Sequence, residues 1–247
     1  MKIRKGWVVS VLFMFAASAG AITADELIAK NIEAKGGIEK MRAVKSLRQT
    51  GTIRFGEGGA GDLSYTALSK RPNMIRTEVS RQGLTAISAY DGAAGWAVRP
   101  FFGRKDPEKM SADDMKGMQL QADMDGPLVD YKTKGNRVEY LGTEDVDGTE
   151  AHKLKITLKN GDVRYVYLDP DYFLEIRILD QTKIRGVEEE EETDLGDYVQ
   201  VNGVYLPFSI EVGSKGGPRF QKITIDKAEA NLDIDDALFH FPATAGK

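Results

Sequence analysis

The sequence predicts a mainly β protein, a single open antiparallel half-barrel of about eleven strands with helices in its concave mouth. Short segments of alternating apolar and polar residues recur at hairpin spacing on both sides of residues 91–133. Residues 91–133 themselves are aromatic, rich in Met and helical in pattern. The chain has too few amphipathic helices to cover both faces of a sheet this large, so we expect the sheet to curl around them.

Residues 1–21 have the composition of an export signal. Three cations precede an apolar run over residues 7–17, and Ala19-Gly20-Ala21 fits the small-residue cleavage rule. The apolar run is shorter than the roughly 20 residues that a membrane-spanning helix needs. We therefore expect cleavage of this signal peptide and a soluble exported domain over residues 22–247.

Charge and cysteine content limit the possible functions. Loss of the three signal-peptide cations changes the formal net charge from −4 to −7. An acidic chain argues against nucleic acid as a partner, because binding to phosphates requires a basic face. The chain contains no cysteine, so it has neither disulfides nor a thiol that could carry a lipid.

The first elements of the exported part carry clear end signals. Thr23 and Glu26 form a capping box that begins a helix, and Gly36-Gly37 ends it. A second short helical piece covers residues 38–44, and from Ser46 the apolar period becomes two. Further strands are expected at residues 63–67, 74–80 and 84–90, with a turn at Arg71-Pro72-Asn73.

The glycine-rich segment 56–61 matches the dinucleotide-binding pattern G-x-G-x-x-G letter by letter. That pattern binds a pyrophosphate only when a helix follows it. Here Leu63, Tyr65 and Ala67 alternate as a strand, so we interpret the segment as a hairpin loop.

The central segment contains a predicted helix that Ser111 and Asp114 cap and Gly126-Pro127 ends. Four of the eight methionines of the chain fall in it, and Met adapts to apolar partners of variable shape. On this helix Met115, Met118 and Ala122 share one face, and Leu120 and Met124 form an adjacent row.

Two interpretations of this apolar helix remain open: ordinary core packed on a sheet, or a lid around residues 100–133 that contacts a ligand. The lid interpretation predicts a ligand site lined by nine residues: Trp96, Phe101, Phe102, Met115, Met118, Leu120, Met124, Leu128 and Tyr131.

After Gly135 the alternation is cleaner, and strands with one buried face are expected. Leu174, Ile176 and Ile178 are predicted to face away from Glu175 and Arg177. In residues 204–212 Pro207 lies between the alternating apolar residues, on the opposite side of the strand, which places it near a sheet edge or a bulge. The run Glu188–Glu192 is interpreted as a solvated sheet edge rather than a cation site.

Catalytic patterns are not found. His152 and His240 are the two histidines, and neither has a second metal ligand at a suitable spacing. His152 is in phase with Leu154 and Ile156, as in a strand, and no nucleophile elbow or phosphate loop occurs. We predict neither an enzyme nor a bound cofactor or metal.

Four segments carry a resemblance to a known family: "AKGGIEKMRAVKSLRQTGTI" at 34–53, "DGPLVDYKTKG" at 125–135, "YVYLDPDYFLEIRI" at 165–178 and "VNGVYLPFSIE" at 201–211. Together with the signal peptide, they resemble the periplasmic outer-membrane lipoprotein-sorting proteins, the LolA/LolB-like superfamily. The resemblance implies an open half-barrel with a helical lid that carries lipoprotein acyl chains or other lipids across the periplasm. It also implies an inner-membrane exporter or an outer-membrane acceptor as partner.

The sequence departs from the family at two points. The lipid-anchor cysteine of the membrane receptor is absent, and no arginine is matched to the one that latches the lid of the soluble carrier. An alternative function therefore stays open: an envelope sensor or interaction protein that binds a protein partner through the same fold, at the strand edge beside the glutamates.

We expect the mature chain to begin at Ile22, because Ala19-Gly20-Ala21 satisfies the small-residue rule, or at Asp25 if Ala24 is used instead. N-terminal sequencing of the exported protein checks this expectation. Membrane-bound protein that retains Met1 would contradict it.

Overall fold

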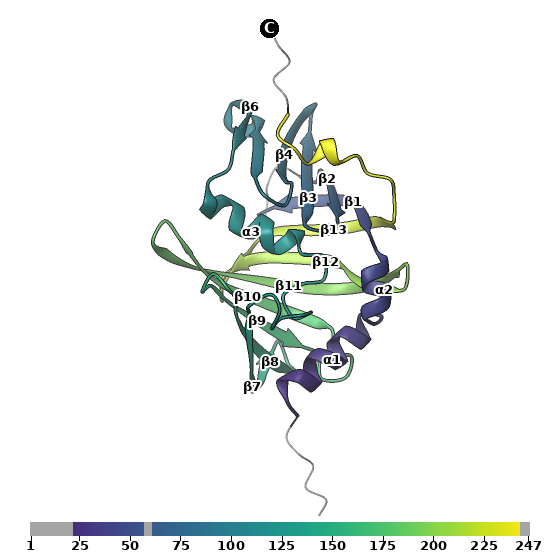
Figure 1. Cartoon of the computed structure of the whole chain (residues 1–247). Helices are drawn as coiled ribbons and strands as arrows, with labels where there is room; N and C mark the ends of the chain where they lie inside the picture. The colour runs from purple at the N-terminus through teal and green to yellow at the C-terminus, as the bar shows by residue number, and fades with distance from the viewer. Residues whose placement is uncertain (1–21, 57–60, 243–247) are drawn as a thin grey trace, which may run out of the picture.

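The computed structural model describes residues 22–56 and 61–242. The predicted signal peptide and most of the glycine-rich loop lie outside the described residues. The described strands form one antiparallel sheet in the order β6-β5-β4-β3-β2-β1-β13-β12-β11-β10-β9-β8-β7. The sheet is open and strongly curved (Figure 1), which confirms the predicted half-barrel.

Thirteen strands make up this sheet, where about eleven were expected. Their bounds are β1 Ser46–Phe55, β2 Leu63–Lys70, β3 Met74–Arg81, β4 Leu84–Tyr90, β5 Gly95–Arg99, β6 Arg104–Lys109, β7 Arg137–Val146, β8 Thr149–Thr157, β9 Val163–Leu168, β10 Glu175–Ile184, β11 Val187–Val201, β12 Val204–Ser214 and β13 Arg219–Ala230. β6 falls inside the predicted helical insert. It is a highly charged edge strand that pairs with β5, so backbone pairing rather than side-chain pattern makes it a strand.

The first part of β12 is not paired with β13. β12 pairs with β11 from Val204 onward but with β13 only from Ser209 onward. Pro207 lies in the stretch that pairs with β11 alone, as expected for a residue without a backbone N–H. Next to it, β1 and β13 shift register between Thr50 and Gly51.

Three α-helices accompany the sheet. α1 (Ala24–Ala34) has the predicted Thr23–Glu26 capping box, and α2 (Ile38–Ala43) follows after two glycines with positive φ. α3 (Ala112–Ala122) begins with the predicted capping box of Ser111 and Asp114. It ends at Ala122 rather than at Gly126-Pro127, because residues 123–130 turn away to make other contacts.

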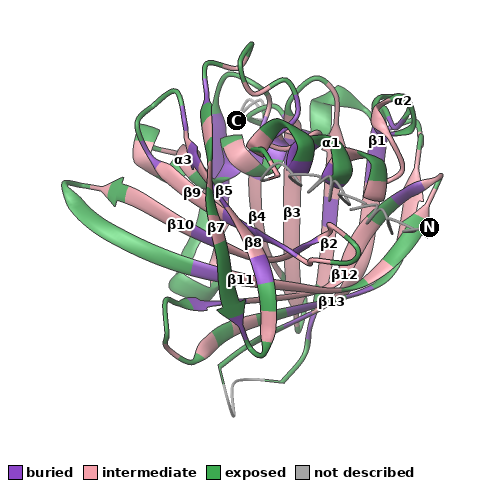
Figure 2. Ribbon diagram, turned by 90° about the horizontal axis from the view of Figure 1, so that it is seen from below, coloured by how far each residue is buried: buried purple, intermediate pink, exposed green. Residues whose placement is uncertain are grey.

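All three helices pack on the concave face of the sheet, at the mouth seen in Figure 2. α1 buries Leu27 and Ile28 against β8 and β9. α2 buries Met41 against Leu47 of β1 and Val204 of β12. α3 packs on β3 and β4. The apolar concave face is thus covered in three separate patches, with space between them.

Two strand predictions are wrong. Glu175 was expected to face away from Ile178, yet both line one cavity, because a register shift between Glu175 and Arg177 changes the alternation. The run Glu188–Glu192 was expected at a sheet edge, but β11 lies between β10 and β12. The first four glutamates are exposed, as the solvated interpretation expected, whereas Glu192 is buried and pairs with Arg219 at 2.5 Å.

Within residues 22–56 and 61–242, no helix is long and apolar enough to cross a membrane.

The register shift in β1 generates a stability prediction. A Cβ added at Gly51 would lie 1.9 Å from the carbonyl oxygen of Thr224, whereas one added at Gly196 would meet only Ser209 Cβ at 4.0 Å. We expect Gly51→Ala to lower the free energy of unfolding by about 2 to 3 kcal/mol, because β1 and β13 must separate.

Gly196→Ala is the matched control in a strand interior, and we expect it to change the free energy of unfolding by less than about 0.5 kcal/mol. Urea denaturation of both variants measures the difference. Equal midpoints would contradict a close approach of β1 to β13.

Candidate functional site

A cavity of about 350 Å³ lies between the concave face of the sheet and the elements that cover it. Its wall combines the sheet, α2, the C-terminal end of α3 and residues 123–127. The apolar part of the lining comes from helices, strands and the segments between them and includes Met41, Val44, Leu47, Leu120, Met124, Ile178, Leu195, Val201, Val204 and Leu206. The cavity therefore offers mainly hydrocarbon surface to a ligand.

Polar groups at one end of the cavity are already paired. The ammonium of Lys35 lies 2.9 Å from Glu175 Oε1, and the hydroxyl of Tyr198 donates to the carbonyl oxygen of Glu175 at 2.7 Å. Burial raises the pKa of the Glu175 carboxyl, but the charge and hydrogen bond of Lys35, together with further hydrogen bonds, outweigh burial and leave that pKa below its ordinary value. Burial, followed by the neighbouring Glu175, raises the pKa of Tyr198 well above 10. At this end of the cavity, Lys35 and Glu175 therefore neutralise each other and leave no net charge.

Arg164 also lines the cavity, and it forms a forked ion pair with Asp180 at 2.6 and 2.7 Å. This pair leaves neither charge free for a ligand. The cavity thus suits an apolar ligand better than an ionic one.

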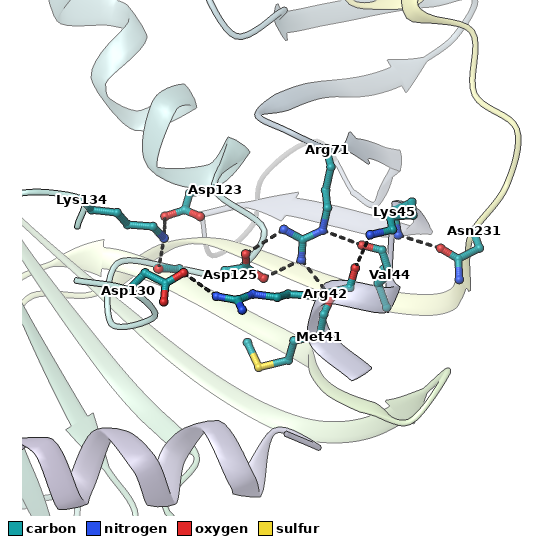
Figure 3. Close-up of polar contacts among 11 residues, drawn as sticks. Met41, Arg42, Val44, Lys45, Arg71, Asp123, Asp125, Asp130, Lys134 and Asn231 are labelled. Carbon is teal, nitrogen blue, oxygen red and sulfur yellow. Dashed lines mark hydrogen bonds and ion pairs between the residues drawn. The ribbon is translucent and has the colours of Figure 1, made fainter. Parts of the chain in front are cut away.

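Arg71, in the turn between β2 and β3, joins the elements that cover the cavity (Figure 3). Its guanidinium donates to the carbonyl oxygens of Val44 at 2.8 Å and Met41 at 2.9 Å, at the C-terminal end of α2. The same guanidinium forms a forked pair with Asp125 at 2.7 and 2.5 Å. One side chain of the sheet therefore holds both α2 and the segment after α3.

Residues 123–130, here called the cover segment, have two further ties. Lys134 pairs with Asp123 and donates to the carbonyl oxygen of Gly126 at 2.7 Å. Arg42 of α2 lies 2.6 Å from Asp130. Figure 3 shows the polar ties of the cover segment, and Leu128 and Val129 anchor its end in buried apolar clusters.

The Arg71–Asp125 pair is the most enclosed of these ties that involve an arginine. The two side chains are 20% and 15% exposed, against 51% and 53% for Arg42 and Asp130. Hydrogen bonding from Arg71 lowers the pKa of Asp125, and Asp125 raises the pKa of Arg71. Because the pKa of Asp125 is lowered by folding, the pair stabilises the protein above about pH 3.9 and loses this effect as the pH falls through the lowered value.

The predicted ligand-binding residues are dispersed. Leu120 and Met124 line the cavity. Met115 and Met118 pack against Ile75 and Tyr90 of the sheet, and Met118 is buried. The two rows that the sequence indicated on α3 thus have different surroundings, one on the sheet and one at the cavity.

The other predicted residues lie away from this cavity. Leu128 is buried in the core beneath α1, and the hydroxyl of Tyr131 donates to Asp25 at 2.8 Å. Trp96 is buried elsewhere and donates to the carbonyl oxygen of Phe239 at 2.8 Å. Phe101 and Phe102 are exposed in the 3-10 turn η1 (Pro100–Phe102).

Sequence reasoning missed Arg71 and most of the cavity lining. Arg71 was noted only as part of a turn, and nothing local in the sequence distinguishes it from other arginines. The lining residues Val204 and Leu206 stood in the alternating pattern of a strand, which indicates one buried face but not the cavity that this face borders.

Among the described residues, no group of three or more His, Cys, Asp or Glu side chains is placed to hold a metal ion. His152 contacts the hydroxyl of Tyr140 at 2.9 Å and stacks on Phe173. It thus has a structural environment in β8 beneath α1.

The geometry of Arg71 predicts an unequal effect of two similar mutations. We expect Arg71→Met to lower the free energy of unfolding by about 2 to 3 kcal/mol, because Asp125 and two helix-end carbonyls lose a charged donor. Arg42→Met removes a half-exposed pair and should change it by less than about 1 kcal/mol.

Denaturant unfolding of both variants tests this prediction, and hydrogen exchange of residues 123–130 tests its location. Faster exchange there in Arg71→Met than in Arg42→Met is expected. Equal effects of the two variants on stability and exchange would show that Arg71 has no special part in holding the cover.

Crystal structures that are similar to this chain over most of its length include the following three. A DUF1329 family protein from Desulfovibrio piger has 14% sequence identity, a TM-score of 0.61, and coverage of 87% of this chain and 96% of its own. For a LolA superfamily protein from Nitrosomonas europaea these values are 13%, 0.59, 89% and 98%. For a domain from Vibrio parahaemolyticus described as an outer membrane lipoprotein-sorting protein they are 11%, 0.58, 86% and 94%.

No protein-family model matches the sequence, and no curated protein matches it. At these identities the three structures establish the fold alone. The resemblance seen in the sequence is confirmed at that level: the chain has a LolA-like fold.

Proposed function

We propose that this protein is a periplasmic carrier that binds acyl chains of lipids or lipoproteins in its cavity and passes them toward the outer membrane. The observation that carries this proposal is a mainly apolar cavity beneath the cover segment, which ion pairs and hydrogen bonds hold in place. Its volume of about 350 Å³ lies at the small end of the range for ligand pockets, roughly 300 to 1,000 Å³. Each CH₂ transferred from water contributes about 0.8 kcal/mol, so an acyl chain needs no directional contacts to bind.

The contacts of the cover segment support a carrier, because part of this segment can move while the buried apolar residues at its end stay packed. Arg71, Arg42 and Lys134 hold the cover segment through ion pairs and carbonyls, while Leu128 and Val129 anchor its end in buried clusters. Ion pairs exchange for water at small net free energy, whereas buried apolar groups do not. Loading would therefore require movement of a short segment only.

The alternative function was expected to bind a protein partner at a sheet edge beside the glutamates, but the structure places these glutamates in an interior strand. β11 is an interior strand, and the sheet edges in the described chain are β6 and β7. β6 contains Pro107 and a run of charges, and β7 has a register shift between Tyr140 and Thr143. Such features discourage strand addition.

Two double variants of α3 and its end separate the roles of its two rows. We expect Leu120→Ser with Met124→Ser to raise the Kd for a fluorescent fatty-acyl probe at least tenfold, because two cavity-lining side chains become polar. The melting temperature should fall by only a few degrees, since both residues are partly exposed.

The matched control is Met115→Ser with Met118→Ser, two changes of the same kind on the sheet-facing row. It should lower the melting temperature more than the first pair does, because Met118 is 8% exposed in a core cluster. Lipid mass spectrometry of the protein purified from its own compartment should detect acyl lipids. A protein that is always empty and binds no probe would contradict the carrier proposal.

A further inference from the structure

One rim of the half-barrel, separate from the cavity, carries a group of exposed apolar side chains. Because the sheet is antiparallel throughout, the end of β1, the start of β4, the end of β5 and the start of β13 all lie at this rim. At these four strand ends and in the 3-10 turn η1 that follows β5 lie five exposed large apolar residues, here called the aromatic rim: Phe55, Leu84, Phe101, Phe102 and Phe220.

Pairing places these residues near one another. The N–H of Gly56 donates to the carbonyl oxygen of Phe220 at 2.9 Å, so Phe55 and Phe220 lie at adjacent strand ends. Leu84 begins β4 where β5 passes into η1, and η1 contacts β4. β4 and β1 are three strands apart, which is about 14 Å at the usual strand spacing. The strand ends that carry these residues therefore lie along one rim of the sheet.

The η1 turn is the most exposed part of this surface. Phe102 is 78% exposed and Phe101 is 41% exposed. Gly103 ends the turn with φ +77°, a conformation that suits glycine, so the two rings sit on a tight turn. Isolated exposed apolar residues are ordinary, but a group of them at one rim indicates an interaction surface.

Cations flank the two phenylalanines. Residues 99–109 contain four basic and two acidic side chains, although the chain as a whole has a formal net charge of −4. Arg99 and Arg104 share Glu108 at 3.8 and 3.1 Å, and Lys105 is exposed. Local positive charge on an acidic protein favours an anionic partner.

We propose that the aromatic rim docks on the surface of a bilayer that contains anionic phospholipid, with Phe102 inserted at the boundary of headgroups and acyl chains. Aromatic rings enter that boundary, and nearby Arg and Lys side chains extend their charges to the phosphates. The part that would insert is the tight η1 turn with its two exposed rings. This shape suits a soft interface, which needs no complementary pocket.

This inference goes beyond the proposed cavity function and does not depend on it, since none of the five rim residues lines the cavity. Docking would bring the protein to a membrane whether or not an acyl chain is bound. The two proposals can therefore fail separately.

Flotation of the mature chain with vesicles tests the docking proposal. Vesicles of phosphatidylcholine alone are compared with vesicles that contain one third phosphatidylglycerol. We expect binding to the anionic vesicles, reduced by salt, and at least a tenfold loss in Phe101→Ser with Phe102→Ser.

The control variant is Tyr172→Ser, which removes an aromatic residue that is 73% exposed in the turn between β9 and β10, at the opposite rim. It should bind vesicles as the unchanged protein does. Absence of binding to anionic vesicles, or equal binding by the double phenylalanine variant, would overturn the proposal.

A tryptophan reporter locates the contact. In residues 22–247 the one native tryptophan is Trp96, which is 3% exposed, so Phe102→Trp adds a distinct signal. We expect its emission to shift to the blue on addition of anionic vesicles and to be quenched by brominated acyl chains. Emission unchanged by vesicles that bind the protein would place the contact elsewhere and overturn the assignment to this rim.

Discussion

The structure depends on how an open sheet covers its apolar concave face. Thirteen strands curve without closing, so the inner face must be covered by other elements or bind a ligand. Three short helices cover it in patches: α1 over β8 and β9, α2 over β1 and β12, and α3 over β3 and β4. The cavity occupies part of the space that they leave. Its position therefore follows from the lengths of the helices and from where each one packs.

Arg71 determines how the remaining space is enclosed. It lies in the turn between β2 and β3, and its donors reach the end of α2 and Asp125 of the cover segment. A large apolar side chain in place of Arg71 would occupy the cavity or pack the cover segment into the hydrophobic core. A guanidinium instead holds two elements by hydrogen bonds that water can replace, because its fork matches carbonyl and carboxylate geometry. The hydrogen bonds of Arg71 therefore fix the positions of α2 and the cover segment, while the free energy needed to exchange them for water stays modest.

Much of the fold could be predicted because its signals are local. The capping boxes at Thr23 and Ser111 and the alternation around Ile53 each depend on a few adjacent residues. The errors occur where pairing overrides pattern. A bulge turns Glu175 to the concave face, and β6 becomes a strand through backbone pairing with β5. The site was harder to predict, since Arg71 and Asp125 are 54 residues apart and only the fold brings them together.

The two rows of α3 show why the core and lid interpretations could not be separated from the sequence. Residues at three- and four-residue spacing form a face, but the sequence does not say what that face meets. In the structure Met118 and Ala122 anchor α3 to the sheet, while Leu120 faces the cavity. The core interpretation thus applies to Met118 and Ala122, and ligand contact at Leu120 stays a prediction. Because Ala122 is buried at one end of the cover segment and Leu128 near the other, an opening that preserves these contacts takes place within residues 123–127. Entry of a ligand would then disturb polar ties and leave the apolar anchors of the helix on the sheet.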